Sequence, residues 1–263
     1  MRTFPKVPKE AIPAVSSQGY VVEEIRLAAP ALAAGTTLRF AHLSDLHVRP
    51  GEERFDRMAR DVSGRDLDFV FITGDMVWVG EDSWDVMLNM VEQLRARHGV
   101  YACRGNWEVK NGSPRLAVQQ ELLAKRGVRL LVNENETVDL AAGRVRIAGV
   151  DDAVLGWPQF EQALPGSGAA DYTILLAHAP LCADMLTGGL SADLVLSGHT
   201  HGGQIRVPLL WKAMMPRGAG RYTDGLCELG ERKLYVNRGF GMAGFTNWRF
   251  RCPAEVAVFE LCG

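Results

Sequence analysis

The chain has 263 residues, of which 47% are hydrophobic and 23% charged, and its formal net charge is −2 at pH 7. This length suffices for one large domain with a substantial core, and no proline-rich linker, low-complexity run or internal repeat divides it. A charge this close to zero provides no basic footprint for nucleic acid, so the composition argues against a nucleic-acid partner.

In chain order, the N-terminal half alternates strands and helices. We assign residues 1–36 to an N-terminal extension with an edge strand, followed by a single domain over residues 37–263. Thr37–Leu43 alternates as a strand does, and Leu67–Ile72 is an apolar run with the length of a buried strand. Ser83–His98 carries apolar residues at a period of about 3.6, which predicts a helix with one buried face.

The alternation continues through the middle of the chain. Short apolar runs that predict further buried strands are Val100–Cys103, Tyr172–Ala177 and Asp193–Leu196. Ser113–Pro114 resembles an N-cap followed by proline at the first position of a helix, which we expect to run to about Arg126 and stop at Gly127. Residues 136–150 and 225–261 are mostly strands. The layering is that of an α/β protein.

Five short blocks end in side chains that bind hard metal ions, and each block follows a predicted strand. The blocks are Asp45-Leu46-His47, Gly74-Asp75, Gly105-Asn106, His178 and Gly198-His199-Thr200-His201. Together they supply carboxylates, an amide and imidazoles. Such a mixed set of oxygen and nitrogen donors suits Mn, Fe, Zn or Mg, whereas copper or cluster sites need thiolates.

The remaining two histidines fit structural roles. His42 lies three positions before Asp45, so its strand parity predicts that it points away from the ligands. His98 closes the predicted helix just ahead of Gly99, where an imidazolium complements the C-terminus of a helix.

The order of the blocks resembles the calcineurin-like metallophosphoesterases, whose pattern is D-x-H, G-D, G-N-H-[DE], H and G-H-x-H. A lone D-x-H is weak evidence, but all five blocks in order at strand ends are specific. The resemblance covers about residues 37–260. It implies a four-layer αββα sandwich, in which two mixed sheets pack face to face with helices outside and the ligands converge at one edge.

The resemblance also implies a centre of two divalent metal ions, with Mn favoured over Fe, Zn or Mg. One ion would be held by Asp45, His47 and His201, the other by Asn106, His178 and His199, and Asp75 would bridge them. A bridging carboxylate is needed because two dications about 3.5–4 Å apart repel each other. We assign catalytic roles to Asp75 and to Asn106, whose amide N–H can donate to a phosphoryl oxygen.

Trp107 departs from the family pattern, which has histidine after Gly-Asn. That histidine is usually assigned to stabilising the phosphoryl group or protonating the leaving oxygen, and an indole neither donates nor accepts a proton at neutral pH. Losing a general acid typically costs about 10²–10⁴-fold for an alkoxide leaving group and far less for an acidic phosphate. Three interpretations stay open: an activated ester or pyrophosphate substrate, another proton donor, or an impaired enzyme that serves as a binding module.

Several residues near these blocks are candidates for substrate binding. In the UDP-2,3-diacylglucosamine hydrolases, a branch of the family, arginine replaces that histidine; here Arg104 precedes the motif and Arg238 follows the predicted strand Lys233–Asn237. We predict that Trp107, Arg104 and Arg238 contact the substrate. For each arginine, a solvated charge at a strand end is the alternative.

Gly202–Pro216 resembles the lipid-linked YkuE/YaeI-type branch of the family, in which G-H-T-H-G-G-Q-I leads into an apolar loop. The apolar residues here are Leu209, Leu210, Trp211, Met214 and Met215, with Lys212, Arg217 and Arg221 nearby. We expect residues 208–216 to contact a membrane interface or to line an acyl groove, with Trp211 at the substrate. A loop that folds back onto the domain is the alternative.

The cysteines and apolar segments bear on location. The five cysteines, Cys103, Cys182, Cys227, Cys252 and Cys262, form no C-x-x-C pair, which is typical of a reduced compartment or of a protein that does not depend on disulfides. No transmembrane run of about 20 apolar residues is present, and residues 1–19 lack the apolar core of a signal peptide. We expect a cytoplasmic location, peripheral to the membrane, with export of a longer precursor as the alternative.

These motifs predict a binuclear metal-dependent phosphoesterase that hydrolyses phosphodiester or pyrophosphate bonds of a lipid-linked or nucleotide substrate. A broad phosphomonoesterase is the second interpretation. A non-catalytic, membrane-associated metal-binding module is the third.

Overall fold

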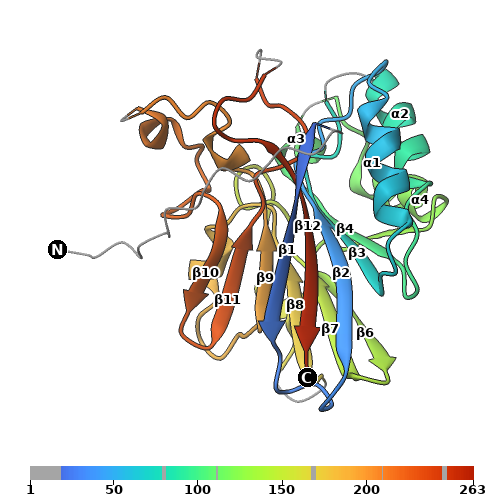
Figure 1. The fold of residues 1–263 in the computed structure, drawn as a ribbon, viewed down its shortest axis with the longest axis vertical. Coiled ribbons are helices and arrows are strands. Elements are labelled where there is room, and N and C mark those ends of the chain that lie inside the picture. Colours follow the sequence, from blue (N-terminus) through green and yellow to red (C-terminus); the bar gives the residue numbers. More distant parts are fainter. Residues whose placement is uncertain (1–18, 79–80, 111, 167–169, 209, 245–247) are drawn as a thin grey trace.

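Two six-stranded sheets lie face to face in the computed structural model (Figure 1). The structure describes residues 19–78, 81–110, 112–166, 170–208, 210–244 and 248–263, so the first half of the predicted N-terminal extension lies outside it. The first sheet has the order β1 (Tyr20–Ala28), β12 (Ala254–Cys262), β2 (Thr37–Leu43), β3 (Phe69–Thr73), β4 (Val100–Cys103) and β5 (Val128–Leu130). The second has the order β10 (Gly225–Leu229), β11 (Arg232–Val236), β9 (Leu194–Ser197), β8 (Tyr172–Leu176), β7 (Gly143–Gly149) and β6 (Glu134–Leu140).

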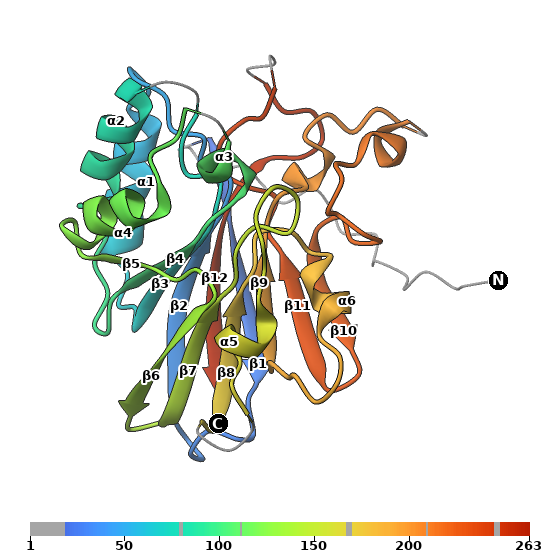
Figure 2. The same ribbon diagram turned by 180° about the vertical axis from the view of Figure 1, so that it is seen from behind.

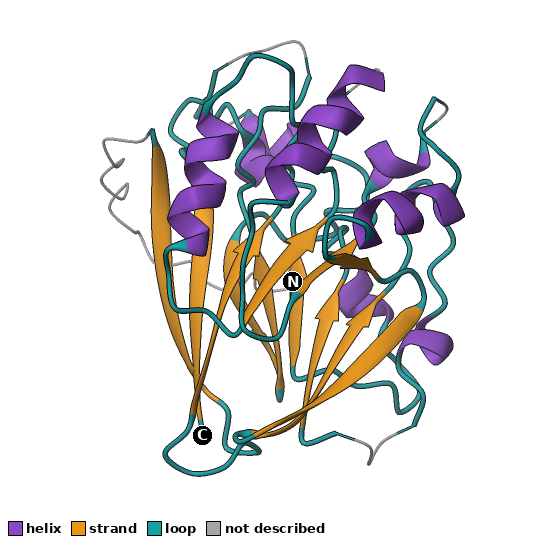
Figure 3. Ribbon diagram, turned by 90° about the vertical axis from the view of Figure 1, so that its right-hand side faces the viewer, coloured by secondary structure: helices purple, strands orange, loops and turns teal. Residues whose placement is uncertain are grey.

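Both sheets are mixed. In the first sheet β2 to β5 run parallel, while β12 is antiparallel to β2 and parallel to β1 at the edge. In the second sheet β11, β9, β8 and β7 run parallel, and the outer strands β10 and β6 are antiparallel to their neighbours. Since parallel strands end at the same edge of a sheet, the segments after these strands gather at one end of the molecule, where most of the helices also lie (Figure 3).

Strand β3 shows how the sequence produces the layers. All of its side chains are buried, and alternate side chains of a strand face opposite sides of the sheet. Phe69 and Phe71 lie in the core between the two sheets, whereas Val70 and Ile72 lie in the core beneath the helices. A strand covered on both faces is therefore mostly apolar, as Phe69–Ile72 of the predicted run is in the sequence.

Helices cover the outer face of each sheet (Figure 2). The first sheet is covered by α1 (Arg54–Ser63), α2 (Glu81–Val91) and α4 (Leu116–Ala124), and the second by the short helices α5 (Phe160–Ala163) and α6 (Cys182–Met185). The buried residues of α1 are Phe55, Met58, Ala59 and Val62, the spacing of one helix face. The predicted four-layer αββα sandwich is confirmed.

The C-terminal end of α2 differs from the prediction. The helix ends at Val91, so the prediction that it reaches His98 is wrong. The backbone N–H of His98 instead donates to the carbonyl oxygen of Asp68 at 2.8 Å, which ties this segment to the chain before β3. The His98 ring lies 5.6 Å from the ring of Phe69 and does not close a helix.

The N-terminal end of α4 also differs. The helix begins at Leu116 with Arg115 as its N-cap residue, so the prediction of an N-cap at Ser113 is wrong. The Ser113 hydroxyl donates to the carbonyl oxygen of Trp107 at 2.9 Å. Ser113 lies two residues before the N-cap position, and no side chain caps the start of this helix.

Candidate metal centre

Every predicted ligand follows the carboxyl end of a strand. Asp45 and His47 come after β2, Asp75 after β3, Asn106 after β4 at the start of α3 (Asn106–Val109), His178 after β8, and His199 and His201 after β9, where the 3-10 helix η1 (His201–Gly203) begins. Ligands from both sheets therefore meet at one end of the sandwich. His42 lies outside this set: its Nε2 is 2.8 Å from Thr73 Oγ1, and burial lowers its pKa to about 3.

The predicted ligands form two compact groups of buried residues. The ligand atoms of Asp45, His47 and His201 lie within 4.8 Å of one another, and so do those of Asp75, His178 and His199. Asn106 joins the second group, because its Oδ1 is 3.3 Å from His178 Nε2. The structure thus contains two candidate metal sites.

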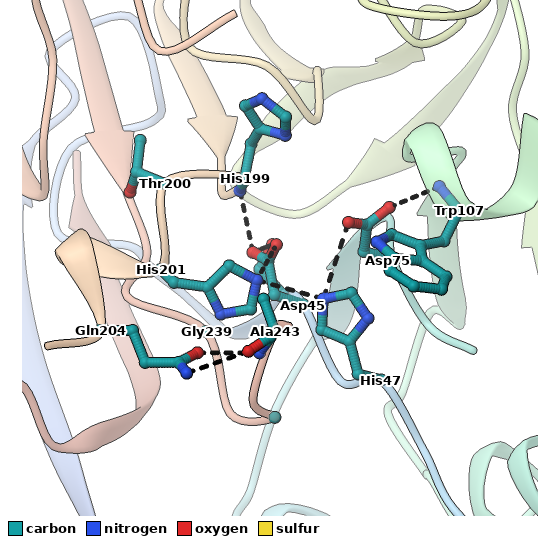
Figure 4. A network of polar contacts seen from close by, with 12 residues as sticks. Asp45, His47, Asp75, Trp107, His199, Thr200, His201, Gln204, Gly239 and Ala243 are labelled. Atoms are coloured by element: carbon teal, nitrogen blue, oxygen red, sulfur yellow. Dashed lines mark hydrogen bonds and ion pairs between the residues drawn. The ribbon is translucent and has the colours of Figure 1, made fainter. Parts of the chain in front are cut away.

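Asp75 lies between the two groups (Figure 4). Its Oδ2 is 3.6 Å from His47 Nε2 in one group and 3.4 Å from His178 Nε2 in the other. Its second oxygen, Oδ1, accepts a hydrogen bond from the Trp107 backbone N–H at 2.8 Å, which fixes the orientation of the carboxylate. One oxygen is therefore held by the protein while the other faces both sites.

The imidazoles are oriented for metal binding by their outer nitrogens. His178 Nδ1 lies 2.7 Å from the carbonyl oxygen of Thr73, and His199 Nε2 lies against the carbonyl oxygen of Arg217, so both nitrogens carry the proton. The inner nitrogens, His178 Nε2 and His199 Nδ1, face each other at 3.1 Å. Burial lowers the pKa of His178, but the charge of Asp75 outweighs burial and holds this pKa well above its usual range, so a proton on Nε2 lies between the two nitrogens in the metal-free site. A metal ion in place of that proton would have both nitrogens directed at it, so these residues fit a bound metal ion.

The first group has the same feature. His47 Nε2 and His201 Nε2 are 3.1 Å apart, and the rings lie nearly parallel. Burial lowers the pKa of His47 to about 3, so its imidazole is neutral at pH 7 and available as a ligand. Burial raises the pKa of Asp45, but the adjacent imidazoles, His201 foremost, outweigh burial and hold this pKa well below its usual range.

Five of the ligands have left-handed backbone angles. The φ values are 49° for Asp45, 43° for His47, 50° for Asp75, 69° for His199 and 51° for His201. Asp and His are among the few residues other than glycine that are enriched in this region. The residue types that bind the metal thus also tolerate the turns that bring them together.

The glycines of the motifs allow close approach of these turns. A Cβ at Gly105 would overlap the Oδ1 atom of Asp75, and a Cβ at Gly198 would overlap Ser44 Oγ and Asp45 Oδ2. Any larger residue at either position would displace a ligand carboxylate. In the pairs Gly105-Asn106 and Gly198-His199, the second residue is a ligand and the glycine leaves room for the carboxylate of a neighbouring ligand.

Glu108, which was not predicted from the sequence, supports the loop of Asp75. Its buried carboxylate accepts hydrogen bonds from four backbone N–H groups, at 2.8 Å from Asp75, 2.7 Å from Met76, 3.2 Å from Val77 and 2.8 Å from Gly105. Burial raises the pKa of Glu108 to about 7, and the charge of Asp75 adds to this effect. The signal for Glu108 in the sequence is its place at the acidic position of the G-N-H-[DE] pattern.

Trp107 forms part of an aromatic wall beside the first group. Its ring stacks on Trp78 with centroids 4.5 Å apart, and it meets the His47 ring edge to face at 5.4 Å. The Lys110 ammonium lies 3.4 Å from the centre of the Trp107 ring, and the Arg49 guanidinium lies 3.9 Å from the centre of the Trp78 ring. The indole is therefore fixed by packing and cation–π contacts.

A pocket of about 440 Å³ opens onto the ligands. Its lining consists of Asp75, Asn106, Trp107, His199, Thr200, His201, Gly203, Gln204, Ile205, Met214, Pro216, Ala243 and Gly244. The predicted substrate residue Trp107 is in this lining. Trp211, in the 3-10 helix η2 (Trp211–Met214), lies behind it, where a Cβ at Gly203 would touch its ring.

The structure does not bring the two predicted substrate arginines to the pocket lining. Arg104 makes a bidentate ion pair with Asp151, with Nη2 2.7 Å from both carboxylate oxygens. Arg238 Nε lies 2.6 Å from Glu255 Oε2, and its Nη2 also contacts Glu23. Both guanidinium groups are largely buried in these pairs, so their geometry favours a structural role over substrate binding.

The fold and the two ligand groups define a metallophosphoesterase, a hydrolase that acts on phosphate esters with bound metal. The chain belongs to the calcineurin-like phosphoesterase family, which matches residues 38–203. The predicted family and enzyme class are confirmed. Among the described helices, none has the length and apolar character required to cross a membrane.

Relatives and solved structures agree with this assignment. The uncharacterized metallophosphoesterase YkuE of Bacillus subtilis is 32% identical over 225 residues, which cover 84% of this chain and 76% of YkuE. Phosphodiesterase YaeI of Escherichia coli is 29% identical over 195 residues, which cover 74% of this chain and 70% of YaeI. The NAD nucleotidase of Haemophilus influenzae has a similar fold, with a TM-score of 0.52 and 11% sequence identity over 79% of this chain and 46% of that one.

Proposed function

We propose that the protein is a phosphodiesterase that uses two metal ions to cleave a substrate with an acidic leaving group and an apolar portion. The position of Asp75 carries this proposal: its Oδ2 lies 3.6 Å from His47 Nε2 and 3.4 Å from His178 Nε2, and the residue lines the pocket. A carboxylate shared by two ligand groups suits a two-metal displacement at phosphorus. The name of the relative YaeI supports the choice of a diester.

The donor atoms support divalent ions at both positions. Asp45, His47 and His201 would hold one ion, His178, His199 and Asn106 the other, and Asp75 both. We propose manganese, since carboxylate, amide and imidazole donors suit it; zinc, iron and magnesium are the alternatives that metal analysis would separate. When bound, such ions stabilise charge on phosphoryl oxygens and lower the pKa of water.

The residues of the pocket bind and orient the substrate but offer few protons. The Asn106 amide would hold a metal with its oxygen and donate its N–H to a phosphoryl oxygen. The Thr200 hydroxyl already donates to the Thr223 carbonyl oxygen, and the Gln204 amide N–H donates to the Ala243 carbonyl oxygen at 3.0 Å. With Trp107 beside them, no described lining residue other than the ligands has a proton to give. The leaving group must therefore be stable as an anion, as a phosphate or an aryl oxide is.

The side of the pocket away from the ligands is apolar. Ile205, Met214, Pro216 and Ala243 form it, and the Met214 side chain is 76% exposed at its mouth. An apolar wall next to the reacting phosphate favours a substrate with an apolar group over a fully hydrated one. We therefore propose a lipid-linked phosphate as the substrate class, with a nucleotide as the alternative.

We propose that residues 208–216 contact a membrane, as predicted from the sequence, and that the neighbouring loop with Trp248 and Phe250 also takes part. Leu210 is 61% exposed, and Trp248 and Phe250 on the neighbouring loop are 54% and 42% exposed. Residues 202–223 contain no acidic side chain, and Lys212 is exposed among them. Leu209 lies outside the described residues. Apolar side chains with basic neighbours suit an anionic membrane surface. The cytoplasmic location likewise stays a prediction.

A metal-reconstituted assay tests the function. The metal-free protein, loaded with Mn²⁺, should hydrolyse bis-p-nitrophenyl phosphate with a higher kcat/KM than p-nitrophenyl phosphate, because the diester fills the apolar side of the pocket. A preference for the monoester would favour the phosphomonoesterase interpretation. Two bound metals without turnover on either compound would favour the binding module.

A further inference from the structure

The turn that carries His201 has an unusual backbone. Four consecutive residues, 201–204, have left-handed φ values of 51°, 55°, 79° and 36°. Two of them are glycines and His201 tolerates this region, but the longer side chain of Gln204 disfavours it. Such a run persists only where contacts outside the turn fix it.

The Gln204 side chain supplies contacts of this kind. Its Oε1 accepts a hydrogen bond from the Ala243 backbone N–H at 2.8 Å, and its Nε2 donates to the Ala243 carbonyl oxygen at 3.0 Å (Figure 4). The Gln204 carbonyl oxygen also accepts a hydrogen bond from the Phe250 N–H at 2.9 Å. Gln204 is only 9% exposed, so these bonds form in a desolvated setting.

The loop that Gln204 holds also contacts the other sheet. The Phe240 N–H donates to the Ser44 carbonyl oxygen at 3.0 Å, and the Gly241 N–H donates to the Asp45 carbonyl oxygen at 2.8 Å. The described residues 238–244 and 248–250 thus join the turn of Asp45, after β2 of the first sheet, to the turn of His201, after β9 of the second. We name the described residues 238–244 and 248–250 the strap.

We propose that Gln204 is a positioning residue for the first metal site, formed by Asp45, His47 and His201. Asp45 and His201 come from different sheets, so their separation depends on what connects the two turns. The strap provides one such connection, beside the hydrogen bond from the His199 N–H to Asp45 Oδ2 at 2.9 Å, and the Gln204 amide fastens the strap to the His201 turn. The second site has other supports, since Glu108, the Thr73 carbonyl oxygen and the Arg217 carbonyl oxygen hold its loops and imidazoles.

The decisive variant is Gln204→Asn. Asparagine keeps the amide and tolerates a left-handed backbone, but it is one methylene too short to reach Ala243. Gln204→Glu is the second variant, which keeps the acceptor for the Ala243 N–H and loses the donor to its carbonyl oxygen. The matched control is Gln120→Asn on α4, where the amide bonds to Leu130 and Glu134 lie in another part of the structure.

Mn²⁺ titration of each metal-free protein gives the affinities, and anomalous scattering from crystals grown at limiting Mn²⁺ assigns them to the two sites. We expect Gln204→Asn to weaken the first site by about 10–100-fold and to leave the second within about threefold of the parent, with a smaller loss for Gln204→Glu. Equal affinities in the variants and the parent would overturn the proposal. Equal weakening of both sites would overturn it too, because that result indicates general destabilisation.

This inference rests on the two metal sites of the proposed function but does not depend on turnover. If the protein cleaves no phosphodiester and the affinities still split between the sites, the proposed function fails and the role of Gln204 stands. If diester cleavage is observed and the affinities of the two sites do not differ, the proposed function stands and the role of Gln204 fails. A rise in KM with unchanged kcat in a fully loaded Gln204→Asn variant would add that the strap also shapes the pocket wall.

Discussion

At position 107 an indole occupies the place where the family pattern has an imidazole. Its surroundings show how the site accommodates the exchange: Trp78 stacks on the ring at 4.5 Å, and Lys110 lies over it at 3.4 Å. The backbone N–H of the same residue still orients Asp75. The substitution therefore removes a proton donor without removing the support of the bridging carboxylate.

The first prediction concerns the leaving group. With no acid at Trp107, kcat/KM for a series of aryl phosphodiesters should fall steeply as the pKa of the leaving phenol rises. Trp107→His should flatten that dependence, because an imidazolium can protonate the departing oxygen, an effect worth up to about 10²–10⁴-fold for the poorest leaving groups. Trp107→Phe is the control for lost packing, and slopes that do not differ between the histidine variant and the parent would refute the role.

The second prediction concerns the bridge. Asp75→Asn should bind fewer than two metals per chain and lose nearly all turnover, because it removes the charge whose Oδ2 faces both sites. The fold should survive, since asparagine tolerates a φ of 50° and its Oδ1 can still accept from the Trp107 N–H. Metal content by mass spectrometry and the unfolding curve are the measurements. Two metals and parental activity would contradict the assignment.

Single residues also mark the limit of sequence reasoning. The grouping of the ligands was predictable, because each ligand block follows a predicted strand and three of the five blocks begin with glycine. The pairing of Arg104 with Asp151 was not, because the partners lie 47 positions apart and only the fold brings them together. The four hydrogen bonds to Glu108 were not predictable for the same reason, since three of the N–H groups belong to the loop after β3, which is distant from Glu108 in the sequence.

At the scale of elements, loops and the short helices α3, η1 and η2 form the pocket, and the longer described helices do not. The strand positions were predictable from apolar runs, because a strand buried on both faces leaves a continuous signal. Helix ends were less predictable: α2 stops at Val91 although apolar spacing continues to Leu94, which is buried without being helical. After the helix ends, the backbone is held by hydrogen bonds to other elements, such as the bond from the His98 N–H to the Asp68 carbonyl oxygen.

The third prediction tests the apolar loop. Burying one such side chain fully in lipid contributes on the order of 1.5–3 kcal/mol, so partial insertion of two should give measurable vesicle binding. Val207→Ser/Leu210→Ser should reduce co-sedimentation with anionic vesicles and activity on acylated substrates. Both residues are exposed, at 42% and 61%, and neither lines the pocket, so the rate on small soluble diesters should persist.

The matched control for the loop is Val118→Ser/Leu226→Ser. These side chains are 44% and 42% exposed on α4 and β10, so the control removes a similar amount of exposed apolar surface from other elements. Vesicle binding should be unchanged in it. Equal losses on soluble and acylated substrates in the Val207/Leu210 variant would show that the loop supports the fold and does not meet a membrane.

At the scale of the whole molecule, the metal sites join the two sheets. Asp45 and Asp75 leave the first sheet, and His178, His199 and His201 leave the second, so each ligand group draws on both. The sandwich itself needs no metal to explain its packing, since Phe40, Phe71 and Phe259 fill the space between the sheets. Bound ions would therefore add cross-links to an existing core.

The fourth prediction follows from these cross-links. Free Mn²⁺ at about 1,000 times the dissociation constant of one site should stabilise the folded state by about 4 kcal/mol, a rise in Tm of roughly 8–16 °C for a chain of this size. Thermal unfolding with Mn²⁺ and with excess EDTA measures the difference. Asp75→Asn should show a smaller rise. Tight binding of two ions with no change in Tm would contradict the joining of the sheets by metal.

The left-handed turns under Asp45, His47, Asp75, His199 and His201 bear on how such a chain evolves. Each turn costs on the order of 1 kcal/mol or more, and together they approach a sizeable part of the net stability of a typical domain. A lineage that abandoned catalysis would gain stability by exchanging these residues for glycine or asparagine, without altering the sandwich. The same five positions thus combine a ligand with a strained backbone, so an exchange to glycine at any of them should relieve strain in the metal-free protein and remove a ligand.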